Sequence, residues 1–266
     1  MTIGLIGCGK MGSALTLGAI KKGVFESHQV LAYDPVPKTI AALGDGISAA
    51  ESLEEAIQGS NILLLCVKPY QVSEILAKIP KLVESPAKLL VISIAAGVKI
   101  ETMERSCNHE ARIVRAMPNT PALVGEGAAA FTLGKNATGA DADFTAKLLG
   151  SIGIVYEVKE SLLDTVTGLS GSGPAYVYTF IEALADGALL EGLPRDQALA
   201  LATQTVLGAA RMVANSGEHP SVLRDRVTSP GGTTIAGLAA LEEGAFRSSA
   251  INAVKAATEK ARDLGR

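Results

Sequence analysis

The stretch Ile3-Gly4-Leu5-Ile6-Gly7-Cys8-Gly9-Lys10-Met11-Gly12 decides the fold. Its apolar first half predicts a buried strand, and a helical pattern begins by Ser13. The three glycines between them have the spacing GxGxxG. In a dinucleotide-binding turn the first glycine makes the tight turn, the second lets a pyrophosphate approach, and the third packs helix on strand. The position of the motif between a strand and a helix favours dinucleotide binding over a purely structural glycine turn.

The bulk composition sets limits on size and on the class of partner. A chain of 266 residues is long for one domain and predicts two. Hydrophobic residues make up 48% of the chain, which is enough for a sizeable core. The net charge of −3, without a basic run or a series of stacking aromatic residues, argues against binding to nucleic acid.

The three cysteines, Cys8, Cys66 and Cys107, have no CxxC spacing. We interpret them as small buried side chains in a reducing compartment, not as a zinc site or a disulfide framework. No signal-peptide pattern precedes the first strand, and no apolar run approaches 18 residues. These features predict a soluble cytoplasmic protein without membrane association.

Strand and helix patterns alternate over the first 159 residues. Further strands are expected at Val30–Asp34, Asn61–Val67, Lys88–Ile94, Arg112–Met117, Ala128–Leu133 and Ile154–Val158, and helices at Ser13–Lys22, Gln71–Ile79, Ile100–Arg105 and Ala142–Leu149. Another short helix begins with a capping-box pattern at Ser52. Alternation with short loops predicts an α/β fold with a parallel, doubly wound sheet of the Rossmann type.

Ligands of such sheets collect at the carboxyl ends of the strands. The residues at those ends are Gly7–Gly12, Asp34, Cys66–Pro69, Ala95–Gly97 and Met117–Thr120. Asp34 follows Gly7 by 27 residues, where an acid can accept a hydrogen bond from a ribose 2′-hydroxyl and disfavour a 2′-phosphate. Asp34 could instead only form a turn before Pro35, and nearby Lys38 complicates the choice between NADH and NADPH.

The pattern becomes purely helical from residue 160, so we predict a dinucleotide-binding domain at 1–159 and a helical domain at 160–266. Helices are expected from a capping box at Ser161, from Pro174 to Gly192, from Arg195 to Asn215 and from Ala250 to Leu264. The second and third are almost apolar all round. Such helices are buried on more than one side, which points to a partner subunit, although a buried central helix of a monomer would show the same pattern.

The stretch Thr228-Ser229-Pro230-Gly231-Gly232-Thr233-Thr234 leads into a predicted helix at Ile235–Glu243. It combines backbone N–H groups and hydroxyls at a helix N-terminus, which suits a carboxylate or phosphate. An ordinary cap with Thr233 as the N-cap residue is the alternative.

The residues of hydrolytic and metal catalysis are missing from the pattern. His28, His109 and His219 fall in polar connections and are interpreted as surface residues, not general bases. We found no G-x-S-x-G, metal-ligand spacing or carboxylate cluster, so no metal is predicted. Hydride transfer to a protonated imine needs little acid–base machinery from the protein, because the cofactor supplies the chemistry.

Taken together, several motifs closely resemble the pyrroline-5-carboxylate reductase family nearly from end to end. They are the glycine loop Gly7–Gly12, Val67-Lys68-Pro69, Ala95-Ala96-Gly97, Met117-Pro118-Asn119-Thr120-Pro121, Leu169-Ser170-Gly171-Ser172-Gly173-Pro174-Ala175-Tyr176 and Ser229-Pro230-Gly231-Gly232-Thr233-Thr234. The last two are the most specific, since the wider group of Rossmann hydroxyacid dehydrogenases lacks them.

The resemblance implies reduction of the C=N bond of 1-pyrroline-5-carboxylate to L-proline, the last step of proline biosynthesis, with NADPH or NADH. It implies a helical domain that interlocks in a homodimer, often assembled into a decamer of five dimers. It assigns cofactor binding to Gly7, Cys8, Gly9, Lys10, Met11, Gly12, Cys66, Val67, Lys68, Pro69, Ala95, Ala96 and Gly97, beside Asp34. It assigns binding of the substrate carboxylate to Ser229, Gly231, Gly232, Thr233 and Thr234.

The resemblance also places the Thr234 hydroxyl near the ring nitrogen, where it would help to deliver a proton. Asp34 departs from the family, whose NADPH-dependent members often carry a small hydroxyl residue and a nearby basic residue there. Lys68 is expected to orient the cofactor loop without a catalytic role.

Other functions remain as alternatives. The chain could reduce a related cyclic imine, or it could be a β-hydroxyacid dehydrogenase, although Ser161–Leu190 holds no lysine to serve as that enzyme's catalytic base. A non-enzymatic dinucleotide-sensing protein would not need the Ser229–Thr234 site.

Overall fold

The computed structural model describes residues 1–265, which form two compact units. The first contains Met1–Ser172 together with the chain from Lys255 onward, and the second contains Gly173–Val254. The boundary that we predict between residues 159 and 160 remains a prediction. By their contacts, residues 160–172 pack with the first unit.

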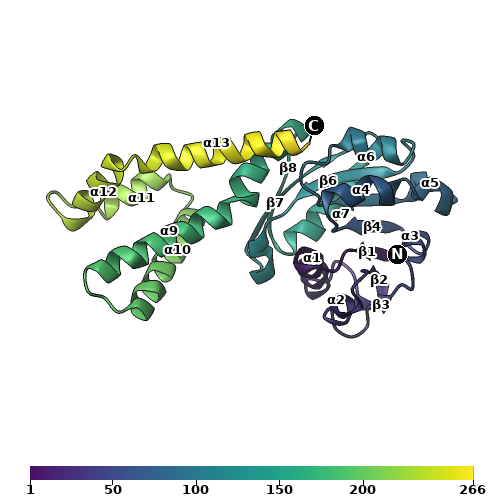
Figure 1. The fold of residues 1–266 in the computed structure, drawn as a ribbon, viewed down its shortest axis with the longest axis horizontal. Helices are drawn as coiled ribbons and strands as arrows, with labels where there is room; N and C mark the ends of the chain where they lie inside the picture. The colour runs from purple at the N-terminus through teal and green to yellow at the C-terminus, as the bar shows by residue number, and fades with distance from the viewer. Residues whose placement is uncertain (266) are drawn as a thin grey trace. The chain divides into compact units, whose positions relative to one another are not determined.

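The first unit is built on one eight-stranded sheet with the order β3-β2-β1-β4-β5-β6-β7-β8 (Figure 1). Its strands are β1 (Ile3–Ile6), β2 (Val30–Tyr33), β3 (Ser48–Ala49), β4 (Ile62–Leu65), β5 (Leu90–Ser93), β6 (Arg112–Met117), β7 (Gly127–Leu133) and β8 (Gly153–Glu157). The short edge strand β3 was not predicted, because two exposed residues carry no apolar pattern.

Most of the sheet is parallel, as predicted, but its last two strands reverse direction. β7 pairs with β6 antiparallel, and β8 is parallel to β7. A wholly parallel sheet is therefore a wrong expectation. The reason is the connection between β6 and β7, which holds only the short 3₁₀ segment η3 (Thr120–Val124) and no crossover helix.

Helices cover both faces of the sheet. Those of the first unit are α1 (Lys10–Lys21), α2 (Pro37–Ala41), α3 (Leu53–Gln58), α4 (Pro69–Leu76), α5 (Ile79–Leu82), α6 (Ile100–Ser106), α7 (Gly139–Gly150) and α8 (Glu160–Val166). Short 3₁₀ segments lie at η1 (Ser27–Gln29) and η2 (Pro86–Lys88). Leu15 of α1 and Leu148 of α7 pack on one face, and Val72 of α4 and Met103 of α6 pack on the other. This double cover explains the continuous apolar run in strands such as β4.

The capping box predicted at Ser161 is wrong. α8 begins one residue earlier, at Glu160, with Lys159 as an N-cap residue that makes no side-chain capping bond. The Glu160 carboxylate accepts a hydrogen bond from the N–H of Ile100 at the start of α6. Glu160 therefore satisfies a free N–H at the start of α6, while α8 itself begins without a side-chain cap. The capping bond predicted at Ser52 is present, since its hydroxyl accepts from the N–H of Glu55.

A single π-helical turn, η4 (Thr167–Gly171), follows α8 at the end of the first unit. The second unit contains α9 (Gly173–Leu190), α10 (Arg195–Ser216), α11 (Pro220–Arg226), α12 (Thr233–Glu243) and the first part of α13 (Phe246–Leu264). Gly217, with φ of 66°, is the left-handed C-cap residue that ends α10. α11 was not predicted.

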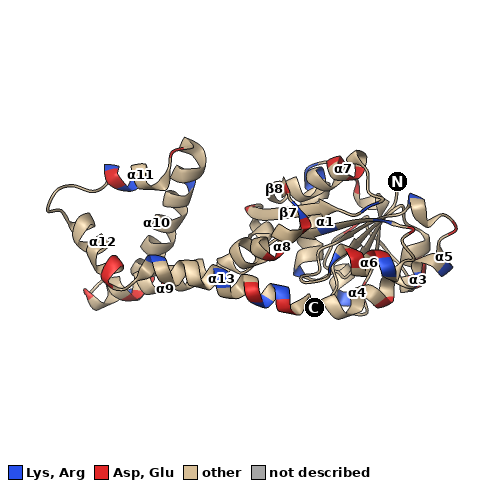
Figure 2. Cartoon of the chain, turned by 90° about the horizontal axis from the view of Figure 1, so that it is seen from above, with Lys and Arg blue, Asp and Glu red and all other residues tan. Residues whose placement is uncertain are grey.

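The apolar residues of the second unit are largely exposed. Ala185 is the single buried residue of α9, and only Ala198 and Ala202 are buried in α10, whereas Leu190 and Leu201 are exposed. Figure 2 shows long stretches without charged residues on α9, α10 and α12. No helix among residues 1–265 is both long and apolar enough to cross a membrane.

Candidate functional site

The glycine loop between β1 and α1 has the geometry that its spacing predicts. Gly7 has φ of +94°, and a Cβ there would lie 2.5 Å from the carbonyl oxygen of Cys66. A Cβ on Gly12 would lie 2.2 Å from the carbonyl oxygen of Gly7. A Cβ on Gly9 would meet no atom within 4 Å, which leaves that backbone open to a ligand. These are the turn, the packing contact and the open approach of a dinucleotide loop.

The loop is held by two side chains. The Asp34 carboxylate, at the end of β2, accepts hydrogen bonds from the N–H of Cys8 at 2.8 Å and from the N–H of Val36 at 2.9 Å. The Ser13 hydroxyl donates to the carbonyl oxygen of Cys8 at 3.0 Å. Asp34 therefore does two things: it holds the glycine loop through Cys8, and it forms the turn after β2 through Val36.

A cavity of about 820 Å³ opens at this edge of the sheet. Every residue that we predict to bind the cofactor lines it, except Cys8, Gly12 and Gly97. Residues at or just beyond the carboxyl ends of β1, β2, β4, β5 and β6 contribute, namely Gly7, Asp34, Cys66, Ile94 and Pro118. The first N–H groups of α1 have no partner within the helix and are available to a phosphate. Together with the size of the cavity and the open backbone at Gly9, they fit a dinucleotide.

Sequence reasoning missed several lining residues. They are Ile6, Tyr33, Pro35, Leu53, Gln71, Glu74, Ile75 and Ile94. Gln71, Glu74 and Ile75 lie on α4 at the spacing of one helical face, which is the signal that could have found them. Lys10, Lys68, Asp34 and Glu74 give the lining two cations and two anions.

The two cysteines of the site are protonated at neutral pH. Burial, with a smaller effect of the Asp34 charge, raises the pKa of the Cys8 thiol to about 12. Burial, with a smaller effect of Cys8, raises the pKa of the Cys66 thiol to about 12. Neither thiol is therefore a nucleophile at neutral pH.

Two further motifs pack against each other inside the first unit. The Asn119 amide donates to the carbonyl oxygen of Ser170 at 2.9 Å, and its oxygen accepts from the N–H of Ala128 at 2.8 Å. A Cβ on Gly171 would lie 2.7 Å from the terminal methyl of Met117, so the Met117 side chain packs closely against this glycine. The stretch at Met117–Pro121 thus holds the π-helical turn in place.

The loop before α12 lies in the second unit. Gly231 has φ of +66°, and a Cβ on Gly232 would lie 2.2 Å from the Ser229 hydroxyl oxygen. Gly232, not Thr233, is the N-cap residue, and it makes no side-chain capping bond. Because the first N–H groups of a helix have no intrahelical partner, α12 presents free donors here.

All three histidines are exposed, which matches their interpretation as surface residues. His28 pairs with exposed Glu26, and the imidazole of His109 lies 3.9 Å from Glu104. His219 begins α11 as its N-cap residue, with Nδ1 2.7 Å from the Ser221 hydroxyl. Within residues 1–265, no group of three or more His, Cys, Asp or Glu side chains could hold a metal ion.

Comparison with known proteins identifies both parts of the chain. Residues 2–97 match the family described as NADP oxidoreductase coenzyme F420-dependent, and residues 160–264 match the family described as pyrroline-5-carboxylate reductase dimerisation. The pyrroline-5-carboxylate reductase of Pisum sativum is 46% identical over 99% of this chain and 96% of its own length. That of Escherichia coli is 43% identical over 99% of this chain and 98% of its own.

Solved structures agree over the whole chain. The pyrroline carboxylate reductase of Plasmodium falciparum, solved with NADP bound, has a TM-score of 0.89 and 36% identity, covering 100% of this chain and 98% of its own. The Coxiella burnetii pyrroline-5-carboxylate reductase has a TM-score of 0.93 and 31% identity, with the same coverage. With the glycine-loop cavity and the helical second unit in place, the chain belongs to the pyrroline-5-carboxylate reductase family.

Proposed function

We propose that this chain reduces 1-pyrroline-5-carboxylate to L-proline with NADPH or NADH. The observation that carries the proposal is the cavity around Gly9, where the backbone is open to a ligand. A dinucleotide suits this cavity, and a nicotinamide cofactor is what the chain's family would place there. The bound cofactor would supply a hydride to the imine carbon. The ring nitrogen takes a proton, so that the C=N double bond becomes a C–N single bond.

The first unit would hold the cofactor. The N–H groups at the start of α1 are proposed to bind the pyrophosphate, with Lys10 adding positive charge. Asp34 is proposed to accept from a ribose hydroxyl, since a carboxylate can accept more bonds than the two already made. The loops Cys66–Pro69 and Ala95–Gly97 are proposed to contact the remainder of the cofactor.

The loop Ser229–Thr234 would bind the substrate. The free N–H groups at the start of α12 suit its carboxylate, and Gly231, with φ of +66°, lets the backbone make the turn before the helix. The Thr234 hydroxyl is proposed to lie near the ring nitrogen and to help deliver its proton. The two neutral thiols of the cofactor site take no part in the chemistry.

The test is steady-state oxidation of NADH and of NADPH by the pure protein with 1-pyrroline-5-carboxylate. Turnover with either cofactor supports the proposal. Cofactor binding without turnover overturns it, and turnover of a different cyclic imine in the same assay would identify the related imine reductase. A protein that binds the dinucleotide but turns over no imine would be the sensing protein.

Variants of Thr234 separate its proposed role from that of the loop. Thr234→Ser keeps the hydroxyl and should retain most of kcat. Thr234→Ala should lower kcat by about 100-fold or more, with the cofactor dissociation constant unchanged, because general acid catalysis typically contributes about 10²- to 10⁴-fold. Equal kcat in the two variants would show that the hydroxyl delivers no proton.

We also propose that the working enzyme is a homodimer; the decamer of five dimers that the resemblance implies is the larger alternative. The dimerisation family match and the exposed apolar residues of the second unit support the dimer. A cytoplasmic location is proposed because a reducing compartment suits the three free thiols. Solution mass separates the dimer from the decamer.

A further inference from the structure

The loop Ala95–Gly97 links β5 to α6 and forms part of the cofactor cavity. Ala95 and Ala96 line the cavity, and Gly97 follows them in the left-handed region with φ of +78°. Ala95 packs in the apolar core at the start of this loop. Two other parts of the chain contact the loop, or the helix that follows it, beyond this point.

The end of α13 contacts this loop through the backbone. A Cβ placed on Gly265 would lie 2.7 Å from the carbonyl oxygen of Gly97, and a Cβ on Gly97 would lie 3.4 Å from Leu264. Glycine at position 265 is therefore required for this close approach. The contact lies within the first unit, which includes the chain from Lys255 onward.

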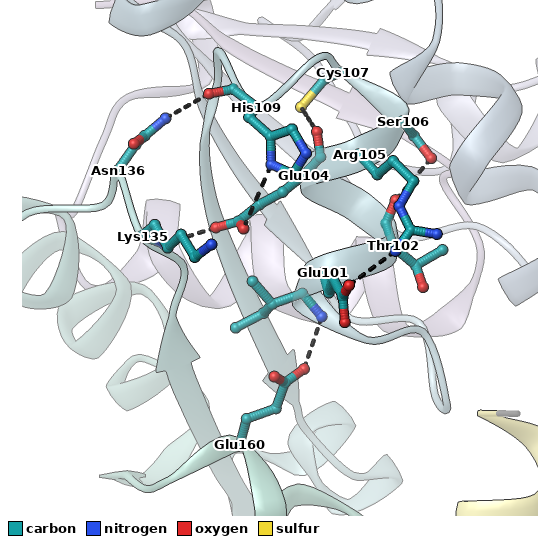
Figure 3. Close-up of polar contacts among 11 residues, drawn as sticks. Glu101, Thr102, Glu104, Arg105, Ser106, Cys107, His109, Lys135, Asn136 and Glu160 are labelled. Atoms are coloured by element: carbon teal, nitrogen blue, oxygen red, sulfur yellow. Dashed lines mark hydrogen bonds and ion pairs between the residues drawn. The ribbon is translucent and has the colours of Figure 1, made fainter.

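The start of α8 holds the other side of the same connection. Glu160 Oε1 accepts from the N–H of Ile100, the first residue of α6, at 2.7 Å (Figure 3). The same oxygen accepts from Arg115 Nη1 at 3.2 Å, and Arg115 also bonds Asp164 at 3.0 Å. Since Arg115 is 4% exposed, this ion-pair group fixes Glu160 firmly on β6.

Both contacts come from the part of the chain that matches the dimerisation family, residues 160–264, or from its next residue. We propose that Glu160 and Gly265 are positioning residues for the cofactor, because together they hold the Ala95–Gly97 loop in its binding geometry. The packing of α8 and of the end of α13 against this loop would then be coupled to cofactor affinity. By linkage, a bound cofactor would in turn stabilise the end of α13. The inference rests on the proposed use of a nicotinamide cofactor.

The test measures NADPH binding to the full chain by calorimetry, without substrate, so that it does not depend on turnover. Gly265→Val should raise the dissociation constant about fivefold or more, a typical size for coupling between sites. Gly139→Val is the matched control, because a Cβ at Gly139 meets no atom within 4 Å. It should bind NADPH as the wild type does.

Glu160 gives a second, independent measurement. Glu160→Gln keeps an oxygen that can accept from the Ile100 N–H and should stay within about twofold of the wild-type dissociation constant, whereas Glu160→Ala should raise it about fivefold. In Gly265→Val, kcat at saturating cofactor should change little, as expected for positioning through the loop. Folded Gly265→Val and Glu160→Ala proteins that bind NADPH like the wild type would overturn the proposal. Wild-type protein that binds NADPH without turning over 1-pyrroline-5-carboxylate would overturn only the proposed function.

Discussion

Asp34 is the residue that we propose to face the ribose of the cofactor. Its two hydrogen bonds from the N–H groups of Cys8 and Val36 fix the carboxylate on the cavity wall, where a 2′-phosphate would meet a negative charge. We therefore expect Asp34→Ser to raise kcat/KM for NADPH relative to NADH by about tenfold, which corresponds to about 1.4 kcal/mol.

The control for this change is Asp45→Asn, which removes a charge from an exposed residue outside the cavity lining. It should leave the cofactor ratio unchanged. An unchanged ratio in Asp34→Ser would instead assign Asp34 to the turn alone. In that case the loss of its bonds to the glycine loop would weaken both cofactors equally.

The buried Cys8 thiol should make the free energy of unfolding depend on pH in the alkaline range. Its pKa is raised from 9.0 to about 12, so the folded protein keeps a proton that the unfolded chain loses above pH 9. The free energy of unfolding should therefore fall as pH rises from about 9 to about 12, by at most about 1.4 kcal/mol per pH unit for each such thiol. Urea unfolding of the wild type and of Cys8→Ala checks this, because the variant should show a shallower fall. Identical slopes would show that Cys8 does not titrate differently in the two states.

At this scale the glycine loop could be predicted from sequence, because each glycine has a distinct steric task within twelve residues. The two hydrogen bonds that the Asp34 carboxylate accepts could not be predicted, because they depend on how β2 packs beside the loop that follows β1. The same limit applies to Glu160, whose partners Ile100 and Arg115 lie 60 and 45 residues away.

Among the elements, α8 depends most on a buried ionic group. Arg115 of β6 is buried and bonds both Glu160 and Asp164 of α8. Arg115→Leu leaves two carboxylates without their cation and should lower the free energy of unfolding by about 3 kcal/mol, as measured by denaturant titration.

The matched control is Arg105→Leu, which breaks the exposed pair between Arg105 and Glu101. It should cost less than about 1 kcal/mol, because an exposed pair contributes little. Adding Glu160→Gln and Asp164→Asn to Arg115→Leu should restore part of the lost stability by removing the unpaired charges. A loss as small as that of Arg105→Leu would show that the ionic group does not hold α8.

Strong patterns predicted most elements to within a few residues, and β6 at Arg112–Met117 was predicted with its observed bounds. The antiparallel direction of β7 was missed because apolar periodicity identifies a strand without its direction. Ser161 was wrongly taken as a cap because its pattern is local, whereas α8 begins at Glu160, whose carboxylate bonds the start of α6.

For the whole molecule, the change of pattern near residue 160 predicts a dinucleotide-binding part and a helical part, and that boundary stays a prediction. Which contacts the last helix makes could not follow from it. The residues from Lys255 onward belong to the first unit, although α13 starts in the second. Periodicity describes the faces of one helix and not the element on which they pack.

The second unit makes the strongest case for self-association, because a stable chain would not leave so much apolar side chain in water. Leu201 of α10 is 58% exposed, and Leu190 at the end of α9 is 87% exposed.

We expect a solution mass of at least twice the 27.3 kDa of one chain by light scattering. Leu201→Glu places a charge in this apolar surface and should shift the mass toward that of one chain. Leu17→Glu, the same change at a 41% exposed leucine on α1 of the first unit, should leave the mass unchanged. A wild-type protein with the mass of one chain would contradict the dimer, and equal masses for the two variants would place the interface away from Leu201.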